Sequence, residues 1–251
     1  MLNIIYSEIL KLKKSYILII ALISGVLIPS TRLISNIMND YSIVPLNDRW
    51  RFFQEDVFDI DRMSVLMVYI IIFCLIAAYI FSREYTDKTS NILYTYPISK
   101  KKIFLGKFIT IYMLIVFVYL IQILTTYLGL YIEWGVLPPI KFIIKDIKVN
   151  IYSMLLQFLL IPIPVLIANI TKNIVFPIIY GLLGDVMMGL LLGSGANIYS
   201  QFFPLTLPTL PFYYYHKGDP IDFVVTIIGA VITFCLFMFL CIYHHSNVDI
   251  E

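Results

Sequence analysis

Six long stretches of this chain contain almost no charged side chain, and that pattern constrains the fold more than any other feature of the sequence. An α-helix needs about 20 consecutive apolar residues to cross the hydrocarbon core of a bilayer. The predicted spans cover approximately residues 15–34, 63–82, 108–132, 149–171, 174–195 and 223–243. Lipid offers no hydrogen bonds to the backbone, so such runs fold as helices. We therefore predict an all-α polytopic membrane protein, a single domain over residues 1–251 with six transmembrane helices.

The composition excludes a soluble enzyme. Hydrophobic residues make up 60% of the chain and charged residues only 14%, whereas soluble domains carry roughly a quarter charged residues. The sequence has no Gly-x-x-x-x-Gly-Lys-Ser/Thr phosphate loop, so ATP hydrolysis by that route is excluded. The adjacent pair His244-His245 lacks further ligands and predicts no metal site. We expect no catalytic residue, no cofactor in this chain and no nucleic-acid partner.

Two segments outside the spans are expected at the membrane surface. Residues 2–14 place four apolar side chains on one helical face, which is typical of a helix lying among lipid headgroups. An ordinary basic flank of the first span is the alternative for this segment. Residues 196–220 are apolar but are interrupted by three prolines, which predicts a re-entrant or interfacial segment rather than a seventh span. Prolines at 162 and 164 likewise predict a break in the fourth span.

The basic residues predict the orientation in the membrane. With six spans, the 18 Lys and Arg residues divide ten to eight between the two sides, so their number alone decides little. The basic cluster within 83–107 lies directly beside the ends of spans two and three, where it has the largest influence on topology. We therefore expect this segment and both termini in the cytoplasm.

The connection between spans two and three, residues 83–107, is the most informative polar segment. Tyr85, Leu93 and Tyr96 fall near one helical face, and Pro97 ends that predicted helix. A short helix that contacts a soluble partner needs an apolar or aromatic patch surrounded by charges. The pattern predicts a docking element for a separate soluble subunit.

Here the sequence resembles the membrane subunits of ABC-2 type exporters. The resemblance rests on residues that follow the second span: Glu84, Lys88-Thr89, Leu93, Pro97-Ile98-Ser99-Lys100 and Lys107. It implies a permease that pairs with a second permease copy or a paralogue, and with ABC ATPase subunits that bind ATP and Mg. It also implies that residues 83–97 act as a coupling helix. The residues to which it assigns ATPase coupling are Arg83, Glu84, Tyr85, Lys88, Thr89, Leu93, Tyr96 and Pro97.

The chain length and the Glu-Tyr-Thr-Asp-Lys-Thr run at 84–89 are most similar to permeases of bacitracin-resistance and lantibiotic-immunity transporters. This similarity implies a lipid-embedded protein of the bacterial cell membrane whose cargo is an amphiphilic peptide. An ABC-2 exporter of a drug, a lipid, a polysaccharide or sodium stays open as an alternative. An ion-driven carrier predicts internal repeats and several polar residues within the spans. A polytopic membrane enzyme needs paired acid and base groups, for which no motif is present.

Asp185 is the acidic residue within the fifth predicted span. An ionised carboxylate at that depth is costly unless it is paired, hydrated or protonated. Asp185 is therefore a candidate substrate-path residue that would contact a cationic cargo. Proton coupling, or a hydrogen bond that fixes the packing of a neighbouring helix, are the alternatives.

The connection before the second span also has a helical pattern. Trp50, Phe53, Val57 and Ile60 are spaced near the helical period among acidic residues. An amphipathic helix on the outer leaflet and a solvated charged loop are both compatible with this pattern.

Overall fold

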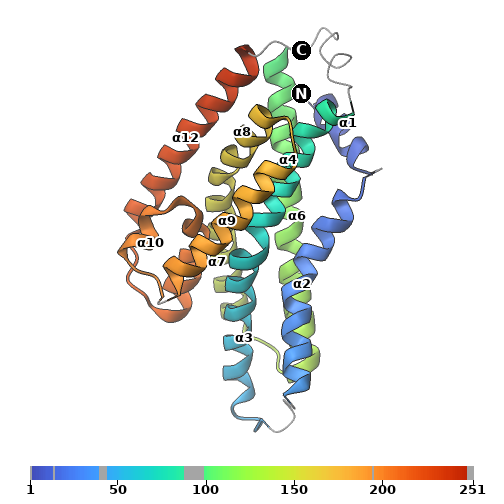
Figure 1. Ribbon diagram of the computed structural model, residues 1–251. Coiled ribbons are helices and arrows are strands. Elements are labelled where there is room, and N and C mark those ends of the chain that lie inside the picture. The colour runs from blue at the N-terminus through green and yellow to red at the C-terminus, as the bar shows by residue number, and fades with distance from the viewer. Residues whose placement is uncertain (1, 14, 40–43, 88–98, 194, 248–251) are drawn as a thin grey trace.

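The computed structural model describes residues 2–13, 15–39, 44–87, 99–193 and 195–247, and every regular element in these ranges is helical (Figure 1). Six helical segments are long and apolar enough to cross a membrane. They are Ile17–Met38, Arg49–Thr86, Lys100–Trp134, Ile140–Thr171, Val175–Leu192 and Phe223–His244. The prediction of an all-α protein with six candidate spans is confirmed.

The second span is longer than the hydropathy pattern predicts. It comprises α3 (Arg49–Met63), the π-helical segment η2 (Ser64–Tyr69) and α4 (Ile70–Thr86), which together form 38 continuous helical residues. The apolar side chains of α3, including Phe53 and Val57, are buried against Leu130 and Trp134. These residues therefore face protein, and the two readings of this connection, a helix on the outer leaflet or a solvated loop, are both wrong.

The third and fourth spans carry the centre of the bundle. Helix α6 (Lys100–Trp134) runs along the whole length of the molecule in Figure 1. The fourth span consists of α7 (Ile140–Leu160) and α8 (Pro162–Thr171), which are separated at Ile161. Proline lacks the backbone donor that would continue the helix, so the break occurs where the prolines predict it.

The last third of the chain contains two spans joined by short helices. Helix α9 (Val175–Leu192) is followed by α10 (Ile198–Phe202), the 3-10 helix η3 (Pro204–Thr209), α11 (Leu210–Phe212), the π-helical η4 (Tyr213–Lys217) and α12 (Phe223–Asn247). Leu205, Leu207, Leu210 and Phe212 of this connection are buried. The proline-interrupted segment therefore packs into the bundle instead of continuing as a regular helix.

Both ends of the chain lie at the same end of the bundle, together with the end of α4 and the beginning of α6 (Figure 1). The amino-terminal helix α1 (Leu2–Lys13) packs against α6 there. Its Leu12 is buried, while Tyr6 and Leu10 remain exposed. Exposed apolar side chains on a terminal helix suit contact with lipid, which is the role proposed for this segment.

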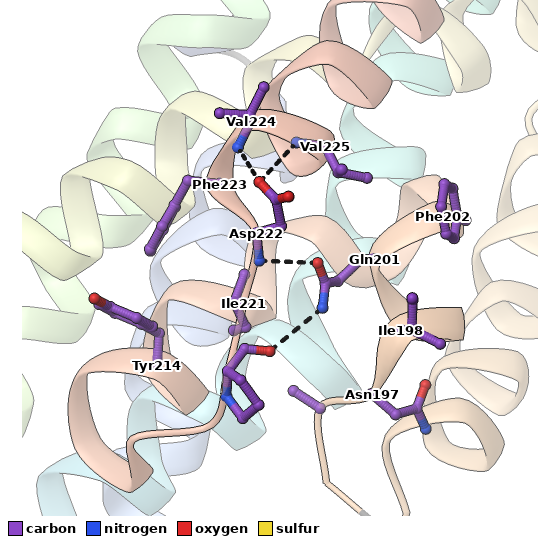
Figure 2. Close-up of a pocket in the computed structure, with 12 residues that line it drawn as sticks. Asn197, Ile198, Gln201, Phe202, Tyr214, Ile221, Asp222, Phe223, Val224 and Val225 are labelled. Carbon is purple, nitrogen blue, oxygen red and sulfur yellow. Dashed lines mark hydrogen bonds between the residues drawn. The ribbon is translucent and has the colours of Figure 1, made fainter.

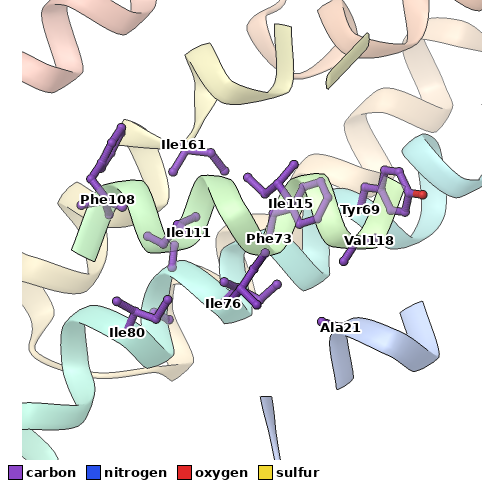
Figure 3. Packing of buried hydrophobic residues seen from close by; sticks show 14 of the residues in the cluster. Ala21, Tyr69, Phe73, Ile76, Ile80, Phe108, Ile111, Ile115, Val118 and Ile161 are labelled. Atoms are coloured by element: carbon purple, nitrogen blue, oxygen red, sulfur yellow. The ribbon is translucent and has the colours of Figure 1, made fainter. Parts of the chain in front are cut away.

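The core is formed where spans two and three face each other. Phe73 and Ile76 of α4 interdigitate with Ile111 and Ile115 of α6, and all four are at most 1% exposed (Figure 3). Helix α2 (Ile17–Met38) approaches α6 closely at Gly25, where an added Cβ would lie 2.9 Å from the backbone oxygen of Val118. Small residues commonly permit such close packing between membrane helices.

Candidate functional site

Glu84 lies at the centre of a buried ion-pair network at the end of the bundle that holds the termini. Its Oε2 is 2.7 Å from Nζ of Lys107 in α6, and its Oε1 is 3.0 Å from Nζ of Lys11 in α1. Glu84 is 7% exposed and Lys107 is 2% exposed. We call Glu8, Lys11, Glu84 and Lys107 the junction cluster. It connects α1, α4 and α6 through three buried charges and the side chain of Lys11, which is 37% exposed.

The remaining contacts of the junction cluster neutralise it. Nζ of Lys11 is 2.6 Å from Oε1 of Glu8, and Nζ of Lys107 also donates to the backbone oxygen of Ile80 at 3.0 Å. Burial by itself lowers the pKa of Lys11, but Glu8 and Glu84 outweigh that effect and raise the pKa above its usual value. Lys11 is therefore charged at neutral pH, and two lysines balance two glutamates.

The neighbours of Glu84 connect this end of α4 to further elements. Arg83 donates from Nη1 to the backbone oxygen of Lys11 at 3.2 Å. Nζ of Lys172, the residue that ends α8, lies 5.4 Å from the centre of the Tyr85 ring. A displacement of α4 near residues 83–86 would therefore act on α1 and on the connection between α8 and α9.

The other predicted coupling residues have no described position relative to the junction cluster. Lys88, Thr89, Leu93, Tyr96 and Pro97 lie outside the described residues. Their coupling role stays a prediction.

Asp185 lies on α9, on a helix that presents much of its surface outward. Leu183 and Val186 beside it are 63% and 61% exposed, whereas Gly181 and Gly184 pack against α4 and its neighbours. Within the described ranges Asp185 makes no hydrogen bond or ion pair. The described part of the chain therefore does not show a hydrogen bond from Asp185 to a neighbouring helix, which was one of the alternatives for this residue.

A pocket of about 750 Å³ opens between α10 and the beginning of α12 (Figure 2). Much of its lining is apolar and includes Ile198, Phe202 and Phe223. Gln201 holds the wall together, because its Oε1 accepts from the backbone N–H of Asp222 at 3.0 Å and its Nε2 donates to the backbone oxygen of Pro220 at 3.4 Å. The amide of Gln201 therefore bonds to backbone groups of the pocket wall, and the interior of the pocket stays apolar.

Sequence reasoning missed Gln201 and Asp222. The Asp222 carboxylate accepts from the backbone N–H groups of Val224 and Val225 at 2.9 and 3.3 Å and so caps the beginning of α12. An aspartate directly before a long apolar run is a recognised helix-start signal and could have located this wall. Nothing in the sequence near Asp222 indicates that α10 forms the other side of this pocket.

Another buried carboxylate, that of Asp56, lies toward the end of the bundle opposite the termini. Asp56 of α3 is 2% exposed, and its Oδ1 is 2.6 Å from Nη2 of Arg32 in α2. Its Oδ2 accepts from Asn36 Nδ2 at 2.8 Å and from Trp134 Nε1 at 2.9 Å. Asp56 thus joins α2, α3 and α6, a role that its position in a predicted connection did not suggest.

The family comparison agrees with this architecture. A family model described as ABC-2 family transporter protein matches residues 4–187, which is 184 of 251 residues and covers α1 through most of α9. No curated protein matches the chain significantly. The family consists of membrane transport subunits rather than enzymes, and membership implies an ABC ATPase partner. With its six candidate spans, the chain belongs to the ABC-2 transporter family as a multi-pass membrane permease.

Proposed function

We propose that this chain is the permease subunit of an ATP-driven exporter that removes a membrane-active peptide antibiotic, of the bacitracin or lantibiotic type, from the bacterial cell membrane. The observation that carries the cargo class is the apolar pocket between α10 and α12. It lies where α9 ends and α12 begins, away from both termini (Figure 1). An apolar pocket of this size suits the hydrophobic part of an amphiphile that is already dissolved in lipid.

We propose that energy enters at the end of the bundle that holds the termini, through a partner ATPase that binds ATP and Mg and docks on residues 83–97. A second permease copy or a paralogue completes the transporter. Arg83 and Tyr85 support this proposal because they connect the end of α4 to α1 and to Lys172. Glu84 would then act from inside the protein, as the anchor that makes these elements move together. Asp185, a partly exposed carboxylate in α9, is the proposed substrate-path residue.

The cargo proposal predicts a selective resistance. Cells that express the chain with its ATPase should tolerate a bacitracin-type or lantibiotic peptide better than cells without it. Ile198→Trp, which fills the pocket, should reduce that tolerance roughly tenfold, as expected for a loss of about 1.4 kcal/mol in cargo binding. Inhibitory concentrations would be compared for peptides, small drugs and sodium stress.

The matched control is Ile232→Trp on α12. Ile198 and Ile232 are similarly exposed, at 64% and 60%, but only Ile198 lines the pocket. The control should keep the resistance of the unaltered chain. Protection against sodium or drugs alone would contradict the peptide assignment and leave the family assignment intact.

The orientation proposal places both termini and residues 83–107 in the cytoplasm. In a chain whose native cysteines are replaced, Asn47→Cys should react with a membrane-impermeant thiol reagent in intact cells, and Ser99→Cys should react only after permeabilisation. Both positions are exposed and lie at opposite ends of the bundle. The reverse labelling pattern would show that the orientation is inverted.

A further inference from the structure

Two cations from distant parts of the chain lie beside one pair of aromatic rings. The rings of Phe58 in α3 and Tyr213 in η4 meet edge to face, with their centroids 6.1 Å apart. The guanidinium carbon of Arg62 lies 5.4 Å from the centroid of the Phe58 ring and 6.0 Å from that of Tyr213. Nζ of Lys217 lies 5.4 and 5.5 Å from the same two centroids. We call these four residues the ring-pair site.

The positive charge at the ring-pair site is only partly balanced. Two cations beside the same rings repel each other. Nη2 of Arg62 is 3.4 Å from Oδ1 of Asp59, whereas charge-assisted hydrogen bonds are commonly about 2.7–2.9 Å long. Asp59 is also shared, since its other carboxylate oxygen is 3.5 Å from Arg32. Nε of Arg62 is buried without an acceptor, and Lys217 has neither a hydrogen bond nor an ion pair in the part of the chain that the structure describes.

Other charged groups nearby do not neutralise this site. Lys145 of α7 adds a third cation, and its Nζ donates to the backbone oxygen of Tyr215 in η4 at 2.9 Å. Asp61 and Asp146 are 2% exposed and accept hydrogen bonds from amide and hydroxyl side chains. Among the described residues, neither aspartate forms an ion pair with a lysine or an arginine. The charges that remain accessible at this surface are therefore mainly positive.

Both cations of the ring-pair site are accessible and lie where a bilayer has its headgroups. Lys217 is exposed, and the side chain of Arg62 is 20% exposed. Arg62 directly precedes the apolar run at 63–82, and Lys217 stands a few residues before the run at 223–243. These runs are long enough to cross the hydrocarbon core, so charges just outside them lie among the headgroups. The anions of that layer are lipid phosphates.

We propose that Arg62 and Lys217 together bind the phosphate of an anionic phospholipid, which joins the second span to η4. An arginine presents parallel N–H donors that fit phosphate oxygens, and a lysine adds a compact charge. A phosphate between the two cations removes their mutual repulsion. The ammonium of a zwitterionic headgroup is repelled by the same cations, so an anionic lipid is preferred.

The bound lipid also steadies one wall of the apolar pocket. Tyr214 lines that pocket and belongs to the same short segment as Tyr213 and Lys217 (Figure 2). Fastening η4 to α3 therefore fixes the position of Tyr214. Lipid binding at the ring-pair site requires neither the cargo nor the partner ATPase, so it is tested on this chain alone.

Native mass spectrometry of the full chain released from neutral detergent micelles tests the proposal. Titration with dioctanoyl phosphatidylglycerol should show one tightly bound lipid, and dioctanoyl phosphatidylcholine should bind more weakly. Each cation near a lipid surface contributes about 1 kcal/mol, so Lys217→Gln should weaken phosphatidylglycerol binding about fivefold. Arg62→Gln/Lys217→Gln should weaken it by about tenfold or more. Because Lys217 is exposed, its single variant tests the site even if the double variant does not fold.

Arg51→Gln/Lys148→Gln is the matched control. It removes the same two charges from α3 and α7, but both residues are exposed and neither lies beside the ring pair. Its affinity for phosphatidylglycerol should stay within about twofold of the wild type, because salt screens distant charges. Equal affinity in the wild type and in Lys217→Gln would overturn the proposal, as would equal binding of the two lipids. Retention of inorganic phosphate as tight as that of phosphatidylglycerol would replace the lipid with a free anion.

Hydrogen–deuterium exchange in nanodiscs locates the bound lipid. Adding phosphatidylglycerol to phosphatidylcholine nanodiscs should slow exchange of the backbone amides at 213–217 in the wild type. In Arg62→Gln/Lys217→Gln the exchange of this segment should be the same in both lipid compositions. A wild type whose residues 213–217 exchange equally in the two compositions would overturn the assignment of the site to η4.

Discussion

Glu84→Ala is expected to destabilise the protein by about 3–5 kcal/mol, the usual consequence of removing one partner from a buried ion pair. The variant leaves Nζ of Lys107, whose side chain is 3% exposed, without its carboxylate. The side chain of Lys11 keeps Glu8 but loses its ion pair with α4. The loss should be measured as the shift in an unfolding titration of the purified chain in mixed micelles.

Asp87→Ala is the matched control for this change. Asp87 is also an acidic residue near the end of α4, but its side chain is 51% exposed and pairs with Arg83 in the preceding turn. Exposed pairs of this kind contribute about 0–1 kcal/mol. The double variant Glu84→Gln/Lys107→Met should recover much of the loss, because it removes both opposing charges of the pair. Equal stability of Glu84→Ala and Asp87→Ala would show that the junction cluster does not hold this end together.

Asp56→Ala should have an effect of similar size, about 3–5 kcal/mol, at the opposite end of the bundle. The change removes the acceptor shared by Arg32, Asn36 and Trp134. The indole N–H of Trp134 loses its acceptor, and the guanidinium of Arg32 keeps only the longer contact to Asp59, at 3.5 Å. The ends of α2, α3 and α6 should separate. In a Trp50→Phe background, the fluorescence of Trp134 should shift toward that of a hydrated indole in parallel with the loss of stability.

Glu55→Ala provides the comparison for Asp56. Glu55 is the preceding residue on α3, its side chain is 52% exposed, and it pairs with Arg51 one turn earlier. Its removal should change stability by about 0–1 kcal/mol and leave the Trp134 emission unchanged. A small effect at Asp56 would mean that the ends of the three spans opposite the termini are held by apolar packing alone.

The sequence by itself determined that the chain is an all-helical protein with six candidate spans. This information is local, because an uncharged run of spanning length is visible in any window of the sequence. The prolines at 162 and 164 likewise determined the break between α7 and α8, since proline removes a backbone donor wherever a helix would place it. A coupling role for residues 83–97 was predicted from the sequence and stays a prediction, because five of the predicted coupling residues lie outside the described residues.

Only the tertiary structure decided which polar groups are buried and what they contact. Glu84 was predicted at a surface for a partner, yet it pairs with Lys107 inside the protein. Asp61 and Asp146 lie outside the predicted spans, yet both are buried, and Asn150 donates to the Asp61 carboxylate and to the backbone oxygen of Asp146, because α3 and α7 begin earlier than hydropathy indicates. A hydropathy window counts a charged residue as unfavourable for a span, because it cannot include a partner that lies far away in the sequence. Burial of a charge depends on that partner, and the packing of the helices alone brings the two together.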